Sequence, residues 1–209
     1  MTHARLVAPQ RCIERGDHRY ALDERHLSDR CRLWRHGAQP WVARIPDPGR
    51  PFIMMQTEHL LDLRHDRIGV CHHSEHERGG GTWWFLSVVS ASGEVLWELQ
   101  QSTCTLQSGL VTSDRLWLTY SRYERESGRE AWAVVQVALD SGQREAVVSV
   151  TGSQACRRSP ELREWLERHP RHRAVLDAES GLGVVRLQAV TEPDAVFSMR
   201  LADLLSPHP

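Results

Sequence analysis

The feature that most constrains the fold of this chain is an internal repeat in its middle. Residues 62–97 and 110–147 match in three groups: Asp66-Arg67-Ile68 with Asp114-Arg115-Leu116, Trp84 with Trp132, and Ser92-Gly93 with Ser141-Gly142. The first two groups lie 48 positions apart (66 to 114) and the last lies 49 apart (92 to 141), so one residue is inserted between them. A chain that repeats a pattern at this distance is expected to build one supersecondary unit twice.

Within each copy the pattern of apolar residues is that of antiparallel strands. Ile68 and Val70 alternate along the first copy as Leu116 and Leu118 do along the second, and a turn containing glycine precedes the last segment. Alternation with a period of two, bounded by turn residues, indicates half-buried strands. Each copy is therefore expected to run strand, polar hairpin, strand, tight turn, strand. The hairpin loops are predicted at residues 72–81 and 121–130, exposed to solvent.

The sequence after the repeat predicts a helix and two further strands. Ser159 is a good N-cap and Pro160 suits the first helical position. An apolar stripe at helical spacing follows, formed by Leu162, Trp165 and Leu166. One helix is therefore expected near residues 160–169. Residues 184–206 again have the pattern strand, turn, strand, and we hypothesise that they form a degenerate third unit.

The first 60 residues give weaker signals. Residues 19–22, 32–34 and 41–45 are predicted to be short strands, and Pro46-Asp47-Pro48-Gly49 is predicted to be a turn. No third set of the anchor residues is found there. The sequence therefore does not assign a role to this region.

The turns of the repeat resemble a known family. Ala91-Ser92-Gly93-Glu94-Val95-Leu96-Trp97 and Ala138-Leu139-Asp140-Ser141-Gly142 resemble the hairpin signature of β-propeller blades of the quinoprotein or WD-like type, over residues 62–147. In that signature an alanine, an acidic residue and a glycine precede a strand that carries tryptophan. The resemblance implies blade-like meanders, and a chain of this length has room for about four. It carries over no functional residue and no cofactor.

Together these patterns predict an all-β fold with one helix. The chain is expected to be a single β-rich domain, residues 1–209, made mainly of antiparallel meanders in a propeller-like or curved sheet. A partial propeller, a curved open sheet and a split sandwich remain alternatives.

Charge and residue usage limit the functions open to the chain. Its 209 residues carry a net charge of −1, and all 26 basic residues are arginine. Without lysine, neither a Schiff base nor a phosphate-loop lysine can form. A net charge near zero gives no long-range attraction to nucleic acid. The bias towards arginine is typical of a GC-rich genome and indicates a bacterial chain.

The cellular compartment is inferred from the apolar segments, the N-terminal residues and the cysteines. No stretch approaches the roughly 18 apolar residues of a membrane span, and residues 1–10 lack the apolar core of a secretory signal. The five cysteines are odd in number and spread out, which is typical of a reducing compartment. We therefore expect a soluble cytoplasmic protein that binds neither membrane nor nucleic acid.

The densest group of candidate metal ligands is Cys71-His72-His73-Ser74-Glu75-His76-Glu77. Cysteine, histidine and glutamate are ligands of zinc. A zinc site here would use His72, His73 and His76, with Cys71 or Glu75 assisting. However, successive residues of a strand face opposite sides, so His72 and His73 diverge, and the corresponding loop of the second copy is simply charged. A solvated hairpin is the competing interpretation, and zinc is the one cofactor considered.

Candidate partner-binding residues lie on the two predicted hairpins. The adjacent Trp83 and Trp84 must face opposite sides of a strand, so at least one lies outside the core unless both faces are covered. Tryptophan and arginine are enriched in binding hot spots. The surface is predicted at five residues: Trp83, Arg78, Arg122, Tyr123 and Arg125.

The leading functional hypothesis is a non-catalytic binding protein, adaptor-like or immunity-protein-like, whose β-meander loops meet a protein partner. One alternative is a zinc-dependent hydrolase or zinc-binding protein that uses the cluster from Cys71 to His76. The other is a structural subunit of a larger β assembly, because an uncovered strand edge pairs with another chain. The sequence has neither a Gly-x-Ser-x-Gly motif nor a glycine-rich phosphate loop, and no catalytic residue is assigned.

Overall fold

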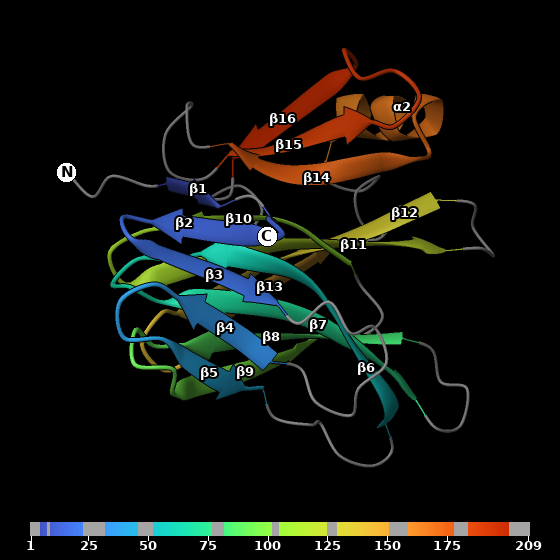
Figure 1. Cartoon of the computed structure of the whole chain (residues 1–209). Helices are drawn as coiled ribbons and strands as arrows, with labels where there is room; N and C mark the ends of the chain where they lie inside the picture. The colour runs from blue at the N-terminus through green and yellow to red at the C-terminus, as the bar shows by residue number, and fades with distance from the viewer. Residues whose placement is uncertain are drawn as a thin grey trace. The chain divides into compact units, whose positions relative to one another are not determined.

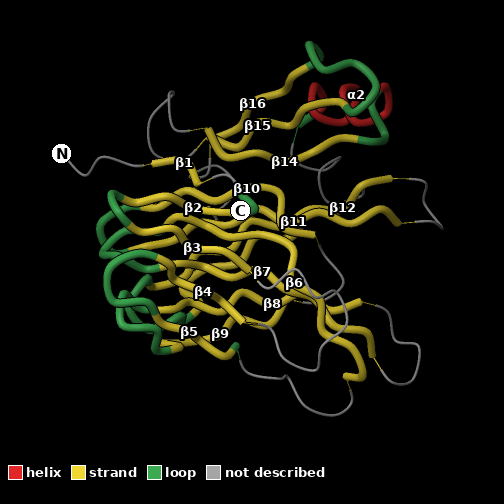
Figure 2. Tube along the Cα trace, viewed as in Figure 1, coloured by secondary structure: helices red, strands yellow, loops and turns green. Residues whose placement is uncertain are grey.

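A computed structural model of the chain describes nine segments: residues 5–7, 9–22, 32–45, 52–76, 82–101, 105–124, 129–150, 159–177 and 184–200. The chain divides into two compact units. The first contains residues 7–104 and 140–142, and the second contains residues 1–6, 105–139 and 143–209. The path of the chain through strands and turns is traced in Figure 2.

The first unit consists of two antiparallel sheets of four strands each (Figure 1). One sheet has the order β2 (Cys12–Arg15), β3 (His18–Leu22), β4 (Arg32–His36) and β5 (Trp41–Arg44). The other has the order β6 (Phe52–Asp62), β7 (Ile68–His76), β8 (Thr82–Val89) and β9 (Val95–Gln101). Each strand pairs with the next one along the chain, so both sheets are meanders.

The core of the first unit is built from both of these sheets. Ile13, Tyr20 and Leu33 of β2–β4 form one hydrophobic cluster with Leu60 and Val70 of β6 and β7. Each of these side chains is at most 3% exposed. Burying an aliphatic side chain of this size stabilises a fold by about 1.5–3 kcal/mol. One face of the sheet β2–β5 is therefore fixed as a core face.

An arginine ties β2 to the turn between β6 and β7. The Arg15 guanidinium donates to the Asp62 carboxylate and to the backbone carbonyls of Leu63 (2.6 Å) and Arg67 (2.9 Å). The Arg67 side chain in turn pairs with Asp140 at 2.6 Å. Because the Arg15 donors meet several acceptors at once, they hold the end of β2 against this turn.

The second unit contains a five-stranded sheet and a three-stranded sheet. The larger has the order β1 (Arg5–Val7), β10 (Thr105–Val111), β11 (Arg115–Glu124), β12 (Arg129–Ala138) and β13 (Arg144–Val150). The smaller has the order β14 (His172–Asp177), β15 (Val184–Ala189) and β16 (Val196–Arg200).

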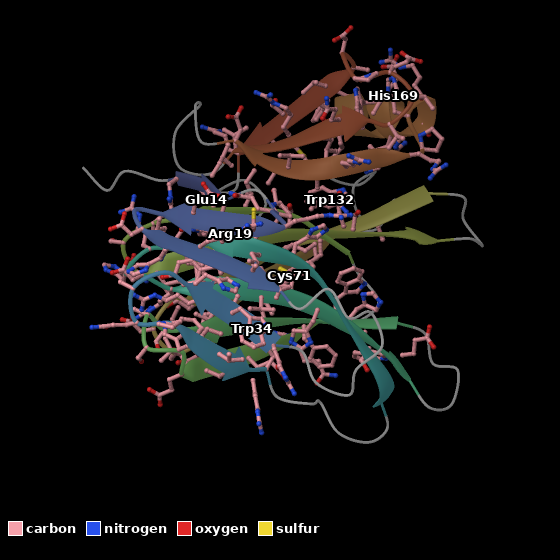
Figure 3. All side chains as sticks on the ribbon, in the orientation of Figure 1. Glu14, Arg19, Trp34, Cys71, Trp132 and His169 are labelled. Atoms are coloured by element: carbon pink, nitrogen blue, oxygen red, sulfur yellow. The ribbon has the colours of Figure 1, made fainter. Side chains whose placement is uncertain are left out.

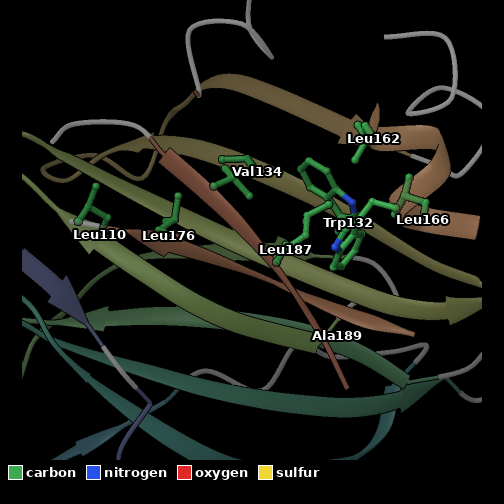
Figure 4. Close-up of a cluster of buried hydrophobic side chains, with 11 residues drawn as sticks. Leu110, Trp132, Val134, Leu162, Leu166, Leu176, Leu187 and Ala189 are labelled. Carbon is green, nitrogen blue, oxygen red and sulfur yellow. The ribbon is translucent and has the colours of Figure 1, made fainter. Parts of the chain in front are cut away.

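The helix α2 (Pro160–Arg168) covers part of the second unit's core. The Ser159 hydroxyl accepts the Leu162 backbone N–H at 3.1 Å, as an N-cap does. Leu162 and Leu166 belong to one hydrophobic cluster with Trp132 of β12, Leu176 of β14 and Leu187 of β15, and they lie beside Trp132 (Figure 4). The apolar stripe of this helix is therefore its buried face, as its spacing predicts.

Tryptophan rings lie directly on two turn glycines of the first unit. A Cβ added to Gly93 would come within 2.9 Å of the Trp41 ring, and one added to Gly142 within 2.6 Å of the Trp97 ring. Both glycines have positive φ, +87° and +69°, as their predicted tight turns require. The Trp41 indole N–H also donates to the Ala91 carbonyl at 2.8 Å.

The sheets β6–β9 and β10–β13 have the same strand register. The corresponding pairs are Ile68↔Val89 with Leu116↔Val137, and His73↔Trp84 with Ser121↔Trp132. Irregularities also correspond, between Thr57/His59 and Leu106/Ser108 in the first strands and between Val88/Val89 and Gln136/Val137 in the third. Trp84 and Trp132 therefore occupy equivalent register positions.

The predicted all-β class is confirmed by these antiparallel sheets, and the predicted helix is present as α2. The start of the first hairpin loop was predicted too early, because β7 continues to His76. Likewise β11 continues to Glu124, past the predicted start of the second loop. In β7 this happens because polar residues are themselves buried there: His72 is 0% exposed and Ser74 is 1% exposed.

Two further predictions can be compared with the described residues. Strands occupy the places expected in residues 184–200, while residues 201–206 of the hypothesised third unit lie outside the described residues. Among the helices described, none is long and apolar enough to cross a membrane.

Replacing either turn glycine by alanine should destabilise the protein through two effects. G93A and G142A introduce a side chain at positive φ, worth about 1 kcal/mol, and press a methyl group into an indole ring, worth about 1–3 kcal/mol more. G16A is the matched control, since Gly16 has φ +53° with nothing within 4 Å of an added Cβ. Urea unfolding curves would measure the three losses, and equal losses would show that the tryptophan contacts are unimportant.

Candidate functional site

The predicted zinc ligands do not come together in the structure. His72 and His73 lie on opposite faces of β7, with the His72 ring 5.2 Å from Phe85 and the His73 ring 5.0 Å from Trp84, between ring centres. The side chain of His76 lies outside the described residues. No group of three or more His, Cys, Asp or Glu side chains among the described residues could hold a metal ion. The zinc site therefore stays a prediction.

His72 instead belongs to a polar chain that crosses three neighbouring strands. Its Nε2 lies 2.9 Å from the Ser87 hydroxyl on β8, and that hydroxyl donates to the Glu98 carboxylate on β9 at 2.7 Å. Because Ser87 has one hydrogen to give, His72 Nε2 must be the donor to Ser87. The prediction that His72 lies in a solvated loop is therefore wrong: it is fully buried.

The electrostatics of Glu98 follow from these contacts. Burial by itself raises the pKa of Glu98, but hydrogen bonds from His72 and Ser87 and the electrostatic effect of His72 outweigh it. The pKa of Glu98 is therefore held below its ordinary value. The Glu98 side chain is 25% exposed, on an edge strand of its sheet.

The hydrogen bonds among serine, histidine and glutamate here run in a different direction from those of a catalytic triad. A serine nucleophile donates its proton to histidine, whereas Ser87 donates to Glu98 and is 0% exposed. At the corresponding register positions the other sheet has Tyr120 and Val135. The sheet β10–β13 therefore has no equivalent of the His72–Ser87 hydrogen bond at these positions.

A pair of buried histidines lies at the end of α2. His169 Nδ1 is 2.9 Å from the Trp165 carbonyl, and His172 Nδ1 is 3.1 Å from the His169 carbonyl. The Trp165 ring contacts both histidine rings, with centres 4.6 and 5.6 Å apart. Burial lowers the pKa of His172, and a charged His169 lowers it further, against the raising effect of the carbonyl. His169 is thus the C-cap residue of α2, and His172 of β14 contacts its backbone carbonyl.

The predicted partner-binding residues are only partly described. Trp83 lies on β8 opposite Ser74 and is half-buried. Arg122 and Tyr123 lie on β11, opposite Ala131 and Glu130, with side chains outside the described residues. Arg78 and Arg125 lie outside the described residues altogether. Their role stays a prediction.

The outward side of the sheet β2–β5 has an ordered pattern that sequence reasoning missed. We call it the outer face, and it lies opposite the core face that carries Ile13 and Leu33. Its residues form three rows across the strands: Glu14–Arg19–His36, Cys12–Ala21–Trp34–Val42, and Arg32–Arg44. Figure 3 labels Glu14, Arg19 and Trp34 on these strands.

The middle row of the outer face is apolar and accessible. Cys12, Ala21 and Trp34 are half-buried, and Val42 is 41% exposed. The Trp34 and His36 rings lie nearly parallel, with an angle of 14° and centres 6.2 Å apart. A charged or polar row flanks the apolar row on each side, and Glu14, Arg19 and Arg44 are exposed. The outer face therefore has an apolar centre and a polar rim.

A sequence signal could have pointed to this sheet. Trp41 follows Gly37 by four residues, as Trp97 follows Gly93 in the first copy of the repeat. Recognising this spacing would place Trp41 at the start of a last strand, and alternation would then turn Val42 outward.

No protein-family model matches this chain, and a search of the curated proteins finds no match.

Removing the charge of Glu98 should change how stability depends on pH. Because its folded pKa lies below the unfolded value of about 4.3, Glu98 stabilises the fold above that pH, and this is lost as pH falls through the folded pKa. E98Q should therefore cost about 1–2 kcal/mol above roughly pH 5 and less in stronger acid. Urea unfolding at several pH values measures this, with E94Q at the exposed Glu94 as control. A pH-independent difference between wild type and E98Q would contradict it.

His172 should make the second unit sensitive to milder acid. Its folded pKa is lowered, so the unfolded chain takes up a proton first. Its contribution to stability is complete above about pH 6.5 and declines as pH falls below that value. H172N keeps a donor for the His169 carbonyl and removes the titration, so its stability should fall less between pH 7 and pH 5, on the order of 1 kcal/mol. Parallel pH profiles of H172N and wild type would refute the assignment.

Proposed function

We propose that this chain is a binding protein that holds a protein partner on the outer face of the sheet β2–β5. The observation that carries the proposal is the row Cys12–Ala21–Trp34–Val42, which crosses all the strands of the sheet with polar rows on both sides. Protein interfaces have this anatomy, with an apolar centre and a polar rim.

The residue types at the centre also support binding. Tryptophan and arginine are enriched among residues that dominate binding energy, and Trp34 lies two residues from Arg32 on the same strand and face. The opposite face of the sheet is already buried in the core. A sheet anchored on one face presents the other as a rigid platform, so its side chains lose little freedom when a partner binds.

The architecture beneath this surface is proposed to be a blade-like repeat. The equal registers of β6–β9 and β10–β13 support it, as do their corresponding irregularities. The spacing from Gly37 to Trp41 extends the pattern to β2–β5. Repeat proteins commonly bind partners on surfaces that successive units present.

A second binding surface is proposed at the hairpin of β11 and β12. Within the described residues β10 begins at Thr105, opposite Ser121, whereas the pairing of β11 with β12 continues to Glu124↔Arg129. A two-stranded ribbon is marginally stable alone, and Arg122 and Tyr123 lie on it. We therefore propose that the partner-binding residues predicted at this hairpin add a second surface to the outer face.

The proposal is tested by substituting the most exposed apolar residue of the outer face. The chain would be used to recover its partner from cells of the source organism, with quantitative mass spectrometry as the measurement. V42D should reduce recovery of that partner by about tenfold or more, as loss of a hot spot does. L96D is the matched control, because Leu96 of β9 is also exposed, at 38%.

Equal unfolding curves for wild type, V42D and L96D would show that both variants fold. If V42D recovered the same proteins as wild type, or if L96D alone lost them, the outer face would not be the binding surface.

A further inference from the structure

The charges on the outer face are not evenly distributed. Glu14 lies opposite Arg19 across β2 and β3, so this row contains both signs of charge. Arg32 lies opposite Arg44 across β4 and β5. Like charges placed directly opposite each other destabilise a sheet. The end of the outer face at Arg32 and Arg44 is therefore the place where an added negative charge would stabilise it.

The described residues of this sheet supply no carboxylate to that end. The acidic residue of the outer face is Glu14, in the row on the far side of Trp34. Rows next to each other on one face are separated by two residues along a strand, roughly 7 Å. Arg32 and Arg44 are thus one row away from Trp34 and two rows away from Glu14.

Guanidinium groups select carboxylates by their shape as well as by charge. Their donors form a planar fork that matches the two oxygens of a carboxylate. Two such groups facing each other can bind one carboxylate from both sides. The apolar side chains of Trp34 and Val42 lie in the adjacent row. A ligand for both rows needs a carboxylate with an apolar group close to it.

We infer that the partner presents an acidic segment to the outer face, with a carboxylate between Arg32 and Arg44 and an apolar side chain on Trp34 and Val42. This inference rests on the proposed function and names the chemistry of its partner. A polypeptide with Asp or Glu next to a large apolar residue meets both requirements. Nucleic acid fits less well, because the row Cys12–Ala21–Trp34–Val42 offers one aromatic ring for stacking and the chain's net charge is −1.

The experiment is a selection from a random peptide library displayed on phage, with wild-type chain as bait. The selected peptides should be enriched in Asp and Glu beside Leu, Phe or Trp. The most enriched peptide, labelled with fluorescein, is then measured by fluorescence anisotropy against each variant.

Charge-reversal variants test whether Arg32 and Arg44 bind the acidic peptide. R32E and R44E should each weaken binding of the acidic peptide by about tenfold, and V42D should weaken it as well. R173E, at an exposed arginine of β14, makes the same change of charge elsewhere and should leave binding unchanged. A peptide with lysine in place of its acidic residues should bind R32E/R44E better than wild type.

Other results would overturn the inference. If V42D weakened binding while R32E and R44E did not, the docking surface would stand and the acidic partner would be wrong. If oligodeoxythymidine bound in an Arg32-dependent way and no acidic peptide did, the partner would be a nucleic acid. Enrichment of uncharged peptides, or of none, would also refute it.

Discussion

The contact on which the first unit depends most is the stacking of tryptophan rings on turn glycines. Trp41 lies on Gly93 and Trp97 lies on Gly142, at distances that leave no space for a Cβ. A flat ring can approach a backbone this closely only where the residue beneath is glycine. In the case of Trp41 the contact joins the last strand of the sheet β2–β5 to the turn between β8 and β9. The packing of the ring on the glycine therefore fixes the position of the strand that carries the tryptophan.

The same contact determines which residues reach the candidate binding surface. Successive residues of a strand face opposite sides, so the inward placement of Trp41 turns Val42 outward, and that of Trp97 turns Leu96 outward. Both Val42 and Leu96 are exposed. What distinguishes them is their surroundings, since Val42 completes an apolar row across four strands. The proposed site is thus a consequence of how the core packs.

Sequence patterns predicted the fold where apolar alternation and turn glycines agreed, as they do around Ile68 and Gly93. They located α2 because Ser159 and Pro160 are strong local signals. They failed at His72, since a polar residue satisfied by strands distant in sequence cannot be told from a solvated one. They also missed the outer face, because its rows are formed by register between strands, and no short segment contains Trp34 together with both Val42 and Ala21.

The polar chain through His72, Ser87 and Glu98 affects the register between β7 and β8. β7 carries buried side chains on both faces, Val70 and His72 on one and Cys71 on the other. A shift of one residue between β7 and β8 moves the side chains of one strand to the other face of the sheet. Because both faces of β7 are buried, the hydrophobic effect alone would disfavour this shift only weakly. Such a shift would strand His72 and Ser87 on opposite sides of the sheet, each buried without its hydrogen bond. These three side chains therefore favour the native register of β7 and β8 over a register shifted by one residue.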